Sequence, residues 1–305
     1  MVQGDSLKTK HIIGISGGKD SAALAIHLAR KDGDWRYFRD LLAESDCEDA
    51  AREIEEARQV PPIEYFFTDT GKELPEVYEY LGILEKFLGK PVSRLSPFPN
   101  GSDANATPFD HFLWAEHGGL LPSRRQRWCT YKMKIKPMNA FVGDAPTVNY
   151  VGIRADEASR SKLSSLKNVT AVYPFIRDGL VRDDIVALLE ETTGVPDYYR
   201  WRSRSGCYFC FFQRKSEWLG LRRNHPDLFA KAMRYEEETF DPETGRMYTW
   251  MDKMSLAELD REAQHSSDNE AIIAKDGPMS WQESLLEANL AEDDPHDHAC
   301  TVCSL

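Results

Sequence analysis

Residues 16–21 read Ser-Gly-Gly-Lys-Asp-Ser and have the composition of a phosphate-binding turn. An apolar run, residues 12–16, precedes the turn, and a helical pattern follows it over residues 22–30. A turn between a strand and a helix directs backbone N–H groups and the positive end of the helix dipole at one spot. The two glycines allow a ligand to approach closely, and the serines and the lysine add donors. The sequence therefore predicts a phosphate or pyrophosphate site here.

This turn differs from the two best-known nucleotide-binding loops. A Walker A loop has a glycine five residues before its Gly-Lys pair and Ser or Thr directly after it. Here Ile13 and Asp20 occupy those positions, and the dinucleotide pattern G-x-G-x-x-G is absent. Asp20 opens the expected helix, where the dipole favours an acid, and its carboxylate is also a candidate Mg²⁺ ligand. Both roles are compatible.

Five of the six cysteines form a second group of residues that could bind a metal or take part in redox chemistry. Cys207 and Cys210 make one C-x-x-C pair, Cys300 and Cys303 make another, and Cys129 lies in a basic stretch. In a reducing compartment, C-x-x-C pairs indicate metal or redox sites before structural disulfides. The long interval between the two pairs weakens a compact zinc-ribbon interpretation, and Cys129 has no role in it. Spacing alone leaves an iron–sulfur cluster, a zinc site of the two pairs, and free redox thiols open.

The predicted elements must bring these groups together. Strand-like runs alternate with helical patterns, which indicates βαβ units on a doubly wound, mostly parallel sheet of the α/β class. The expected strands are residues 12–16, 64–68, 92–95, 148–154 and 171–175. The expected helices are residues 22–30, 46–58, 74–88, 109–117, 134–142, 182–191, 214–223 and 226–238. Ligands of such sheets bind at the carboxyl ends of the strands, where three polar turns converge.

The chain divides into a nucleotide-binding domain, residues 1–200, and a helical, cysteine-bearing segment, residues 201–305. The net charge of −12 is concentrated in residues 255–299, which carry −10, so the body of the protein can accept an anion. Residues 122–137 contain six basic residues and no acid, which favours an anion-facing patch around Cys129. Neither a signal peptide nor a membrane-spanning run is present, so we expect a cytoplasmic protein with reduced thiols.

Four segments in this order resemble the phosphoadenosine phosphosulfate (PAPS) reductase-like family of the PP-loop adenine-nucleotide alpha-hydrolase superfamily. They are residues 16–21, 65–73, 152–160 and 173–175, and the similarity covers roughly residues 10–240. The resemblance implies a Rossmann-like PP-loop fold that binds an adenine nucleotide. The nucleotide-binding residues that it implies are Ser16, Gly17, Gly18, Lys19, Asp20, Ser21, Thr68, Asp69, Arg154 and Arg160. From the residues alone, the two arginines could equally pair with Asp156 or Glu157 on a surface.

Within that family the intact Ser-Gly-Gly-x-Asp-Ser loop is similar to the ATP pyrophosphatases, which adenylylate a substrate oxygen, with Lys19 and Asp20 as catalytic candidates. The implied cofactors are ATP, Mg²⁺ and a [4Fe–4S] cluster, with Zn²⁺ as the alternative. The implied ligands are Cys129, Cys207 and Cys210. The fourth position is Cys300, Cys303 or an open site at which iron can hold a sulfide. The sulfur-transfer protein of bacterial DNA phosphorothioation belongs to this branch, so a sulfur donor protein or sulfide is the expected partner.

Three functions remain open from the sequence. The first is ATP-dependent sulfur transfer, with nucleic acid as a candidate acceptor; the aromatic and basic residues at 198–204 would stack bases, or else form a packed cluster. The second is a sulfonucleotide reductase in which Cys303 attacks sulfur. The third is a non-catalytic nucleotide-binding subunit of a defence or modification complex.

Overall fold

The computed structural model describes residues 8–98, 107–161, 166–204 and 206–265. Cys300 and Cys303, and most of the acidic stretch over residues 255–299, lie outside the described residues.

Five strands in the described part of the chain form one parallel sheet with the order β3-β2-β1-β4-β5. They are β1 (Lys10–Gly14), β2 (Ile63–Thr68), β3 (Val92–Leu95), β4 (Thr147–Tyr150) and β5 (Val169–Val172). The order reverses at β1, because β2 and β3 are added on one side of it and β4 and β5 on the other. This is a doubly wound sheet, whose ligand site is expected at the reversal point.

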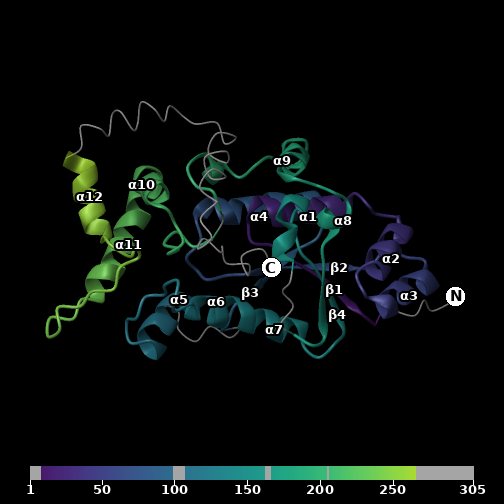
Figure 1. Ribbon diagram of the computed structural model, residues 1–305, viewed down its shortest axis with the longest axis horizontal. Coiled ribbons are helices and arrows are strands. Elements are labelled where there is room, and N and C mark those ends of the chain that lie inside the picture. Colours follow the sequence, from purple (N-terminus) through teal and green to yellow (C-terminus); the bar gives the residue numbers. More distant parts are fainter. Residues whose placement is uncertain (1–7, 99–106, 162–165, 205, 266–305) are drawn as a thin grey trace.

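Helices cover both faces of the sheet (Figure 1). One face carries α1 (Lys19–Ala29), α4 (Pro75–Leu88), α8 (Pro174–Arg177) and α9 (Arg182–Glu190). The other face carries α5 (Pro108–His111), α6 (Trp128–Thr130) and α7 (Lys136–Val142), with one-turn π-helices at Phe112–Glu116 and Tyr131–Ile135. Short 3₁₀ turns span Ala155–Arg160 and Asp197–Arg200.

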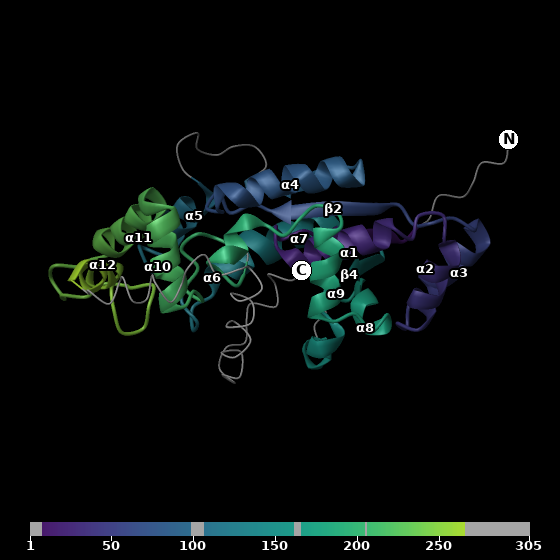
Figure 2. The same ribbon diagram turned by 90° about the horizontal axis from the view of Figure 1, so that it is seen from above.

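The helices at the two ends of the molecule are separate groups (Figure 2). At one end lie α2 (Trp35–Ala43) and α3 (Glu48–Ala57). At the other end lie α10 (Lys215–Asn224), α11 (Pro226–Glu238) and α12 (Leu256–His265). The turn that follows β2 contacts the loop before this second group, because Glu73 forms an antiparallel bridge with Cys207.

The core has two layers because side chains of a strand alternate between faces. Ile13 of β1 belongs to the main apolar cluster, which includes most of α1 and α4. Ile12 faces the other way and packs with Phe66, Met138 and Val142. The central strands β1 and β4 are buried along nearly their whole length, whereas β3 and β5 at the sheet edges carry exposed residues.

The predicted α/β class and parallel sheet are confirmed, with differences at the element ends. The expected strand over residues 171–175 ends at Val172, and α8 begins at Pro174, a residue that suits the first turn of a helix. Helices α2 and α12 were missed. The signal for α2 was present, since Asp34 caps it by accepting from the Tyr37 N–H and Phe38, Leu41 and Leu42 form its buried face.

Candidate functional site

The predicted phosphate-binding turn lies between β1 and α1 and is braced by its own serines. The Ser16 N–H donates to Ser21 Oγ (3.1 Å), and the Gly18 N–H donates to Ser16 Oγ (3.3 Å). Ser21 Oγ in turn donates to the Gly18 carbonyl (3.2 Å). The turn is therefore closed by side chains before any ligand binds. An anion at this place meets the N-terminal end of α1, where the helix dipole is positive.

Two glycines allow neighbouring backbone segments to come close at this turn. Gly17 has a φ of +74°, and a Cβ on it would lie 2.5 Å from Val77 Cγ1 of α4. Gly152 follows β4, and a Cβ there would lie 2.9 Å from the Asp20 carbonyl oxygen. Both positions therefore require glycine, and they hold the turns after β1 and β4 against each other at the reversal point of the sheet.

Lys19, Asp20 and Arg154 form an ion network at the start of α1. Lys19 Nζ lies 3.0 Å from Asp20 Oδ2, and Arg154 Nη1 lies 3.0 Å from Asp20 Oδ1. Burial would raise the pKa of Asp20, but these two cations outweigh it and lower the pKa to about 2. Asp20 is thus a carboxylate with both oxygens engaged. Its role as a Mg²⁺ ligand stays a prediction, whereas its contacts position two cations.

The two predicted anion-binding arginines both contact acids in this structure. The buried Arg154 also pairs with Asp156 (3.0 Å) and Glu157 (3.1 Å), and Arg160 pairs with Glu157 (2.9 Å). These are the surface partners that the sequence offered as the alternative, and the pair between Arg154 and Asp20 was not foreseen. Anion binding by Arg154 and Arg160 stays a prediction, and it requires an anion to compete with these carboxylates.

Thr68 ends β2, and Asp69 stabilises the turn that follows it. The Asp69 side chain accepts from the Gly71 N–H (2.7 Å) and from the Tyr78 hydroxyl (2.8 Å). The Asp69 N–H donates to the Leu95 carbonyl (3.0 Å) at the end of β3. Both residues lie at the carboxyl edge of the sheet, where the nucleoside contact is predicted.

Two tyrosines that precede the cysteine segment clamp the phosphate-binding turn. The Tyr198 hydroxyl donates to the Gly17 carbonyl (2.7 Å), and the Lys19 N–H donates to the Tyr199 hydroxyl (3.1 Å). Both tyrosines are buried, and Arg202 is buried beside them with its guanidinium on the Cys207 carbonyl (2.8 Å). These contacts favour the packed cluster over base stacking for residues 198–204. Sequence reasoning missed the clamp, because nothing local marks a tyrosine as a partner of a distant turn.

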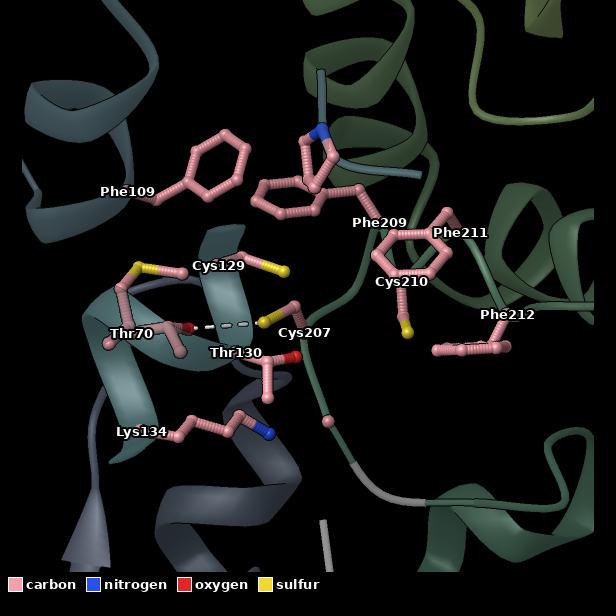
Figure 3. Close-up of a pocket in the computed structure, with 13 residues that line it drawn as sticks. Thr70, Phe109, Cys129, Thr130, Lys134, Cys207, Phe209, Cys210, Phe211 and Phe212 are labelled. Atoms are coloured by element: carbon pink, nitrogen blue, oxygen red, sulfur yellow. Dashed lines mark hydrogen bonds between the residues drawn. The ribbon is translucent and has the colours of Figure 1, made fainter. Parts of the chain in front are cut away.

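Cys129, Cys207 and Cys210 line one pocket (Figure 3). Cys129 comes from α6, and the other two come from the loop before α10. Their segment is fixed to the turn after β2, since the Tyr208 N–H donates to the Lys72 carbonyl (2.9 Å) and Thr70 Oγ1 lies 3.2 Å from Cys207 Sγ. The remaining lining residues are mostly apolar or aromatic: Phe109, Pro122, Thr130, Met133, Lys134, Gly206, Phe209, Phe211 and Phe212.

Two of the three cysteines of this pocket, which are all half-buried, have raised pKa values. Burial raises the pKa of Cys207 well above its usual value, and the neighbouring Glu73 raises it further. Burial also raises the pKa of Cys210, although Arg202 opposes the shift. Burial raises the pKa of Glu73 as well, and its Oε2 has no hydrogen-bond partner among the described residues. The raised pKa values of Cys207 and Cys210 favour the neutral thiol over the thiolate, which is the form that binds a metal or attacks an electrophile.

Three thiols in one pocket could be ligands of a metal ion or of an iron–sulfur cluster. All three cysteines are free thiols, and the space that they line is narrow, with a volume of about 40 Å³. In the described part of the chain, no three Cys, His, Asp or Glu side chains are placed to hold one metal ion. A zinc site needs four donors at about 2.3 Å from one point. An iron–sulfur cluster and zinc at these thiols both stay predictions.

Comparison with known proteins decides the family. Residues 10–177, more than half of the chain, match the phosphoadenosine phosphosulfate reductase domain. The chain belongs to this family. The family is one of enzymes within the PP-loop superfamily, and the predicted resemblance is confirmed at that level. The matched range contains the phosphate-binding turn, Asp69 and Arg154, but it ends before Cys207.

Individual relatives of this PAPS reductase-domain protein are distant. It is 24% identical over 182 residues to an uncharacterised protein of Methanocaldococcus jannaschii, a match that spans 55% of this chain and 35% of that protein. The chain thus spans about a third of the length of that curated relative. It is also similar to the crystal structure of a PAPS reductase from Candida auris, with a TM-score of 0.41 and 10% identity over 65% of this chain and 81% of that one. None of the described helices is long and apolar enough to cross a membrane.

Proposed function

We propose that this protein is an ATP pyrophosphatase of the PAPS reductase family that activates a substrate oxygen and supports sulfur transfer to it. The observation that carries the proposal is the attachment of the cysteine pocket to the nucleotide edge of the sheet. Tyr198 and Tyr199 contact the phosphate-binding turn directly, and Cys207 lies eight residues further along the chain against Thr70 and Glu73. A nucleotide site and a thiol pocket built on one edge suit a reaction that couples them.

The phosphate-binding turn supplies the first half of this chemistry. Its N–H groups and the dipole of α1 stabilise the polyphosphate, and Asp20 holds Lys19 and Arg154 beside it. The substrate oxygen forms a bond to the α-phosphorus of ATP while the bond from that phosphorus to the bridging oxygen breaks. Pyrophosphate leaves with that electron pair, and Mg²⁺, with Asp20 as its candidate ligand, would spread the charge of the leaving group. The adenylylated oxygen is then a leaving group for a sulfur nucleophile.

The cysteine pocket supplies the second half. Cys129, Cys207 and Cys210 would hold a [4Fe–4S] cluster, whose fourth predicted ligand, Cys300 or Cys303, lies outside the described residues. Such a cluster, when bound, supplies an iron centre that is redox-active and binds sulfur. The phenylalanines that line the pocket reduce the contact of the half-buried thiols with water, which would protect a reactive sulfur from side reactions.

The family match itself keeps sulfonucleotide reduction as the second candidate. In that reaction the Cys303 thiolate attacks the sulfur of PAPS, the nucleotide leaves, and a second thiol releases sulfite while a disulfide forms. The two candidates differ in their products, pyrophosphate and sulfite.

The experiment measures both products with protein purified without oxygen. We expect pyrophosphate release from ATP that Ser21→Ala abolishes, because Ser21 braces the turn. We also expect iron and sulfide in the protein, lost in Cys207→Ser and retained in Cys47→Ala. Cys47 is the matched control, since it is a free cysteine at the start of α3 and outside the pocket.

Other results would reject the proposal. Sulfite release from PAPS that depends on Cys303, without pyrophosphate release from ATP, would establish the reductase. Nucleotide binding without turnover in either assay would indicate a binding subunit. A colourless protein with one zinc would reject the cluster.

A further inference from the structure

A second pocket lies next to the cysteine pocket. Neither the adenylylation step nor the sulfur-transfer step of the proposed reaction uses it. Its volume is about 310 Å³, which is within the range of small-molecule sites. It is lined by Lys72, Asp110, Trp114, Tyr208, Lys231, Arg234, Tyr235 and Glu238. The chain alternates between the two pockets, since Tyr208 lines this one while its neighbours Cys207 and Phe209 line the other. Tyr235 packs on Phe209 (5.4 Å between ring centres) and so forms part of the wall between them.

The pocket has two cations to offer a ligand. Lys231 and Arg234 are exposed on α11, three residues apart, which places them on one face of the helix. Neither forms an ion pair with any residue that the structure describes. Lys72 differs, because it pairs with Asp110 at 2.8 Å. Glu238 is the remaining carboxylate of the lining, so a positive excess is left for an anion.

Asp110 is not available to repel that anion strongly. Besides Lys72, it accepts from the Thr107 hydroxyl (2.7 Å) and from the Tyr235 hydroxyl. Burial would raise the pKa of Asp110, but Lys72 and these hydroxyl groups outweigh it and lower the pKa. The floor of the pocket is therefore a satisfied ion pair, and the free cations lie on the α11 side.

Trp114 gives the pocket an aromatic surface. It is 41% exposed, although large aromatic side chains are usually buried. Its ring rests against Gly119, where an added Cβ would lie 3.0 Å from the ring, so the ring is supported on one side. Phe240 and Tyr248 are also exposed, and both lie beside Thr239, which approaches Gly119 as well. Two further exposed rings therefore belong to the segment that follows α11.

We propose that this pocket binds a nucleotide unit, with the base stacked on Trp114 and the phosphate on Lys231 and Arg234. A bare anion would make no use of the exposed ring, and an apolar segment would leave the two cations desolvated and unpaired. A planar ring that carries a phosphate satisfies both features. Free nucleotides and single-stranded nucleic acid share this chemistry, and the run of exposed rings suits successive bases. The site is separate from the phosphate-binding turn and does not rest on the proposed function.

The test measures binding of a short fluorescein-labelled oligothymidylate by anisotropy at several salt concentrations, with thymidine monophosphate as the competitor. For Lys231→Ala/Arg234→Ala we expect weaker binding and a log–log salt slope reduced by about 0.7, since the two cations contact one phosphate and each neutralised phosphate of a single strand contributes about 0.7. For Trp114→Ala we expect at least a roughly fivefold loss, which Trp114→Phe partly restores because stacking survives.

Lys86→Ala/Lys90→Ala is the matched control, because it removes the same charge from exposed lysines at the far end of α4. Circular dichroism confirms that each variant is folded. Competition by the mononucleotide at concentrations similar to the oligonucleotide assigns the pocket to free nucleotides, and binding of the oligonucleotide alone assigns it to a strand. The proposal is overturned if the pocket variants bind like the parent protein, or if the control loses as much affinity. Pyrophosphate release from ATP, measured on the same variants, reports independently on the proposed function.

Discussion

Gly17→Ala tests the close approach between the phosphate-binding turn and α4. The methyl group would lie 2.5 Å from Val77 Cγ1, well inside contact distance, on a residue with a φ of +74°. The left-handed backbone costs an L-residue about 1–2 kcal/mol, and overpacking a buried site adds about 1–3 kcal/mol. We therefore expect the free energy of unfolding to fall by about 2–5 kcal/mol. Urea denaturation followed by circular dichroism measures it, provided that the m-value is unchanged.

Gly33→Ala separates the two contributions. Gly33 also has a positive φ, +81°, but a Cβ there would meet nothing within 4 Å. It should cost only the backbone part, about 1–2 kcal/mol. Val77→Ala provides a second check, because removing Cγ1 relieves the clash. The double variant Gly17→Ala/Val77→Ala should be more stable than the sum of the single losses by about 1 kcal/mol or more.

Equal losses for Gly17→Ala and Gly33→Ala would refute the reasoning, because the contact with Val77 would then contribute nothing. Additive losses in the double variant would refute it as well. If the contact is present, Gly17→Ala also weakens nucleotide binding, since relief of the clash moves either the turn or α4. Gly33→Ala, outside the turn, should bind nucleotide like the parent protein.

Three further predictions follow from the contacts of the site and the core. Arg154→Gln should destabilise the fold by about 3 kcal/mol or more, because it leaves Asp20 and its neighbouring acids without their buried partner; urea denaturation measures this, and the acid transition should move to higher pH as the pKa of Asp20 rises from about 2. A loss below about 1 kcal/mol would show that the pair is not buried as described. Tyr199→Phe should cost about 1 kcal/mol and weaken ATP binding, because the Lys19 N–H loses its acceptor; unchanged stability and affinity would contradict the clamp. Burial raises the pKa of Glu236 from 4.5 to about 7 despite two backbone N–H bonds, so its contribution to stability is fully present below pH 4.5 and is lost as the pH rises through 7. The stability difference between the parent protein and Glu236→Gln should therefore shift by about 3 kcal/mol against the parent over that window, and a constant difference would contradict the shift.

The predicted elements that proved accurate are those with strong local patterns. The sequence around β1 and α1 predicts an apolar strand, a glycine turn and a helix, and the structure has all three. Boundaries were less accurate where two elements adjoin. The expected helix over residues 109–117 is α5 followed by a π-helical turn, and the expected strand end at residues 173–175 is the start of α8. Such boundaries between elements depend on packing against neighbouring elements rather than on the periodicity of apolar residues.

The candidate site shows the same division between local and distant information. The residues of the site could be predicted from the sequence, since phosphate-binding turns and C-x-x-C pairs are local patterns. The contact partners of these residues could not be predicted in the same way. Asp20 contacts Arg154, which is 134 residues away, and Lys19 contacts Tyr199, which is 180 residues away. The sequence of residues 198–204 supported base stacking and a packed cluster equally well. The burial of Tyr198 and Tyr199 in the structure favours the packed cluster.

The sequence by itself determined the class of the fold, the phosphate-binding turn and which cysteines are candidate ligands. The reason is that spacing along one segment determines which side chains a turn or a helix presents together. The tertiary structure decided which of these groups meet. It brought Cys129 to the pocket of Cys207 and Cys210, paired Arg154 with Asp20, and set Trp114 beside Lys231 and Arg234. The physical reason is that long-range neighbours result from how apolar helix and strand faces pack together, and no local spacing encodes that packing.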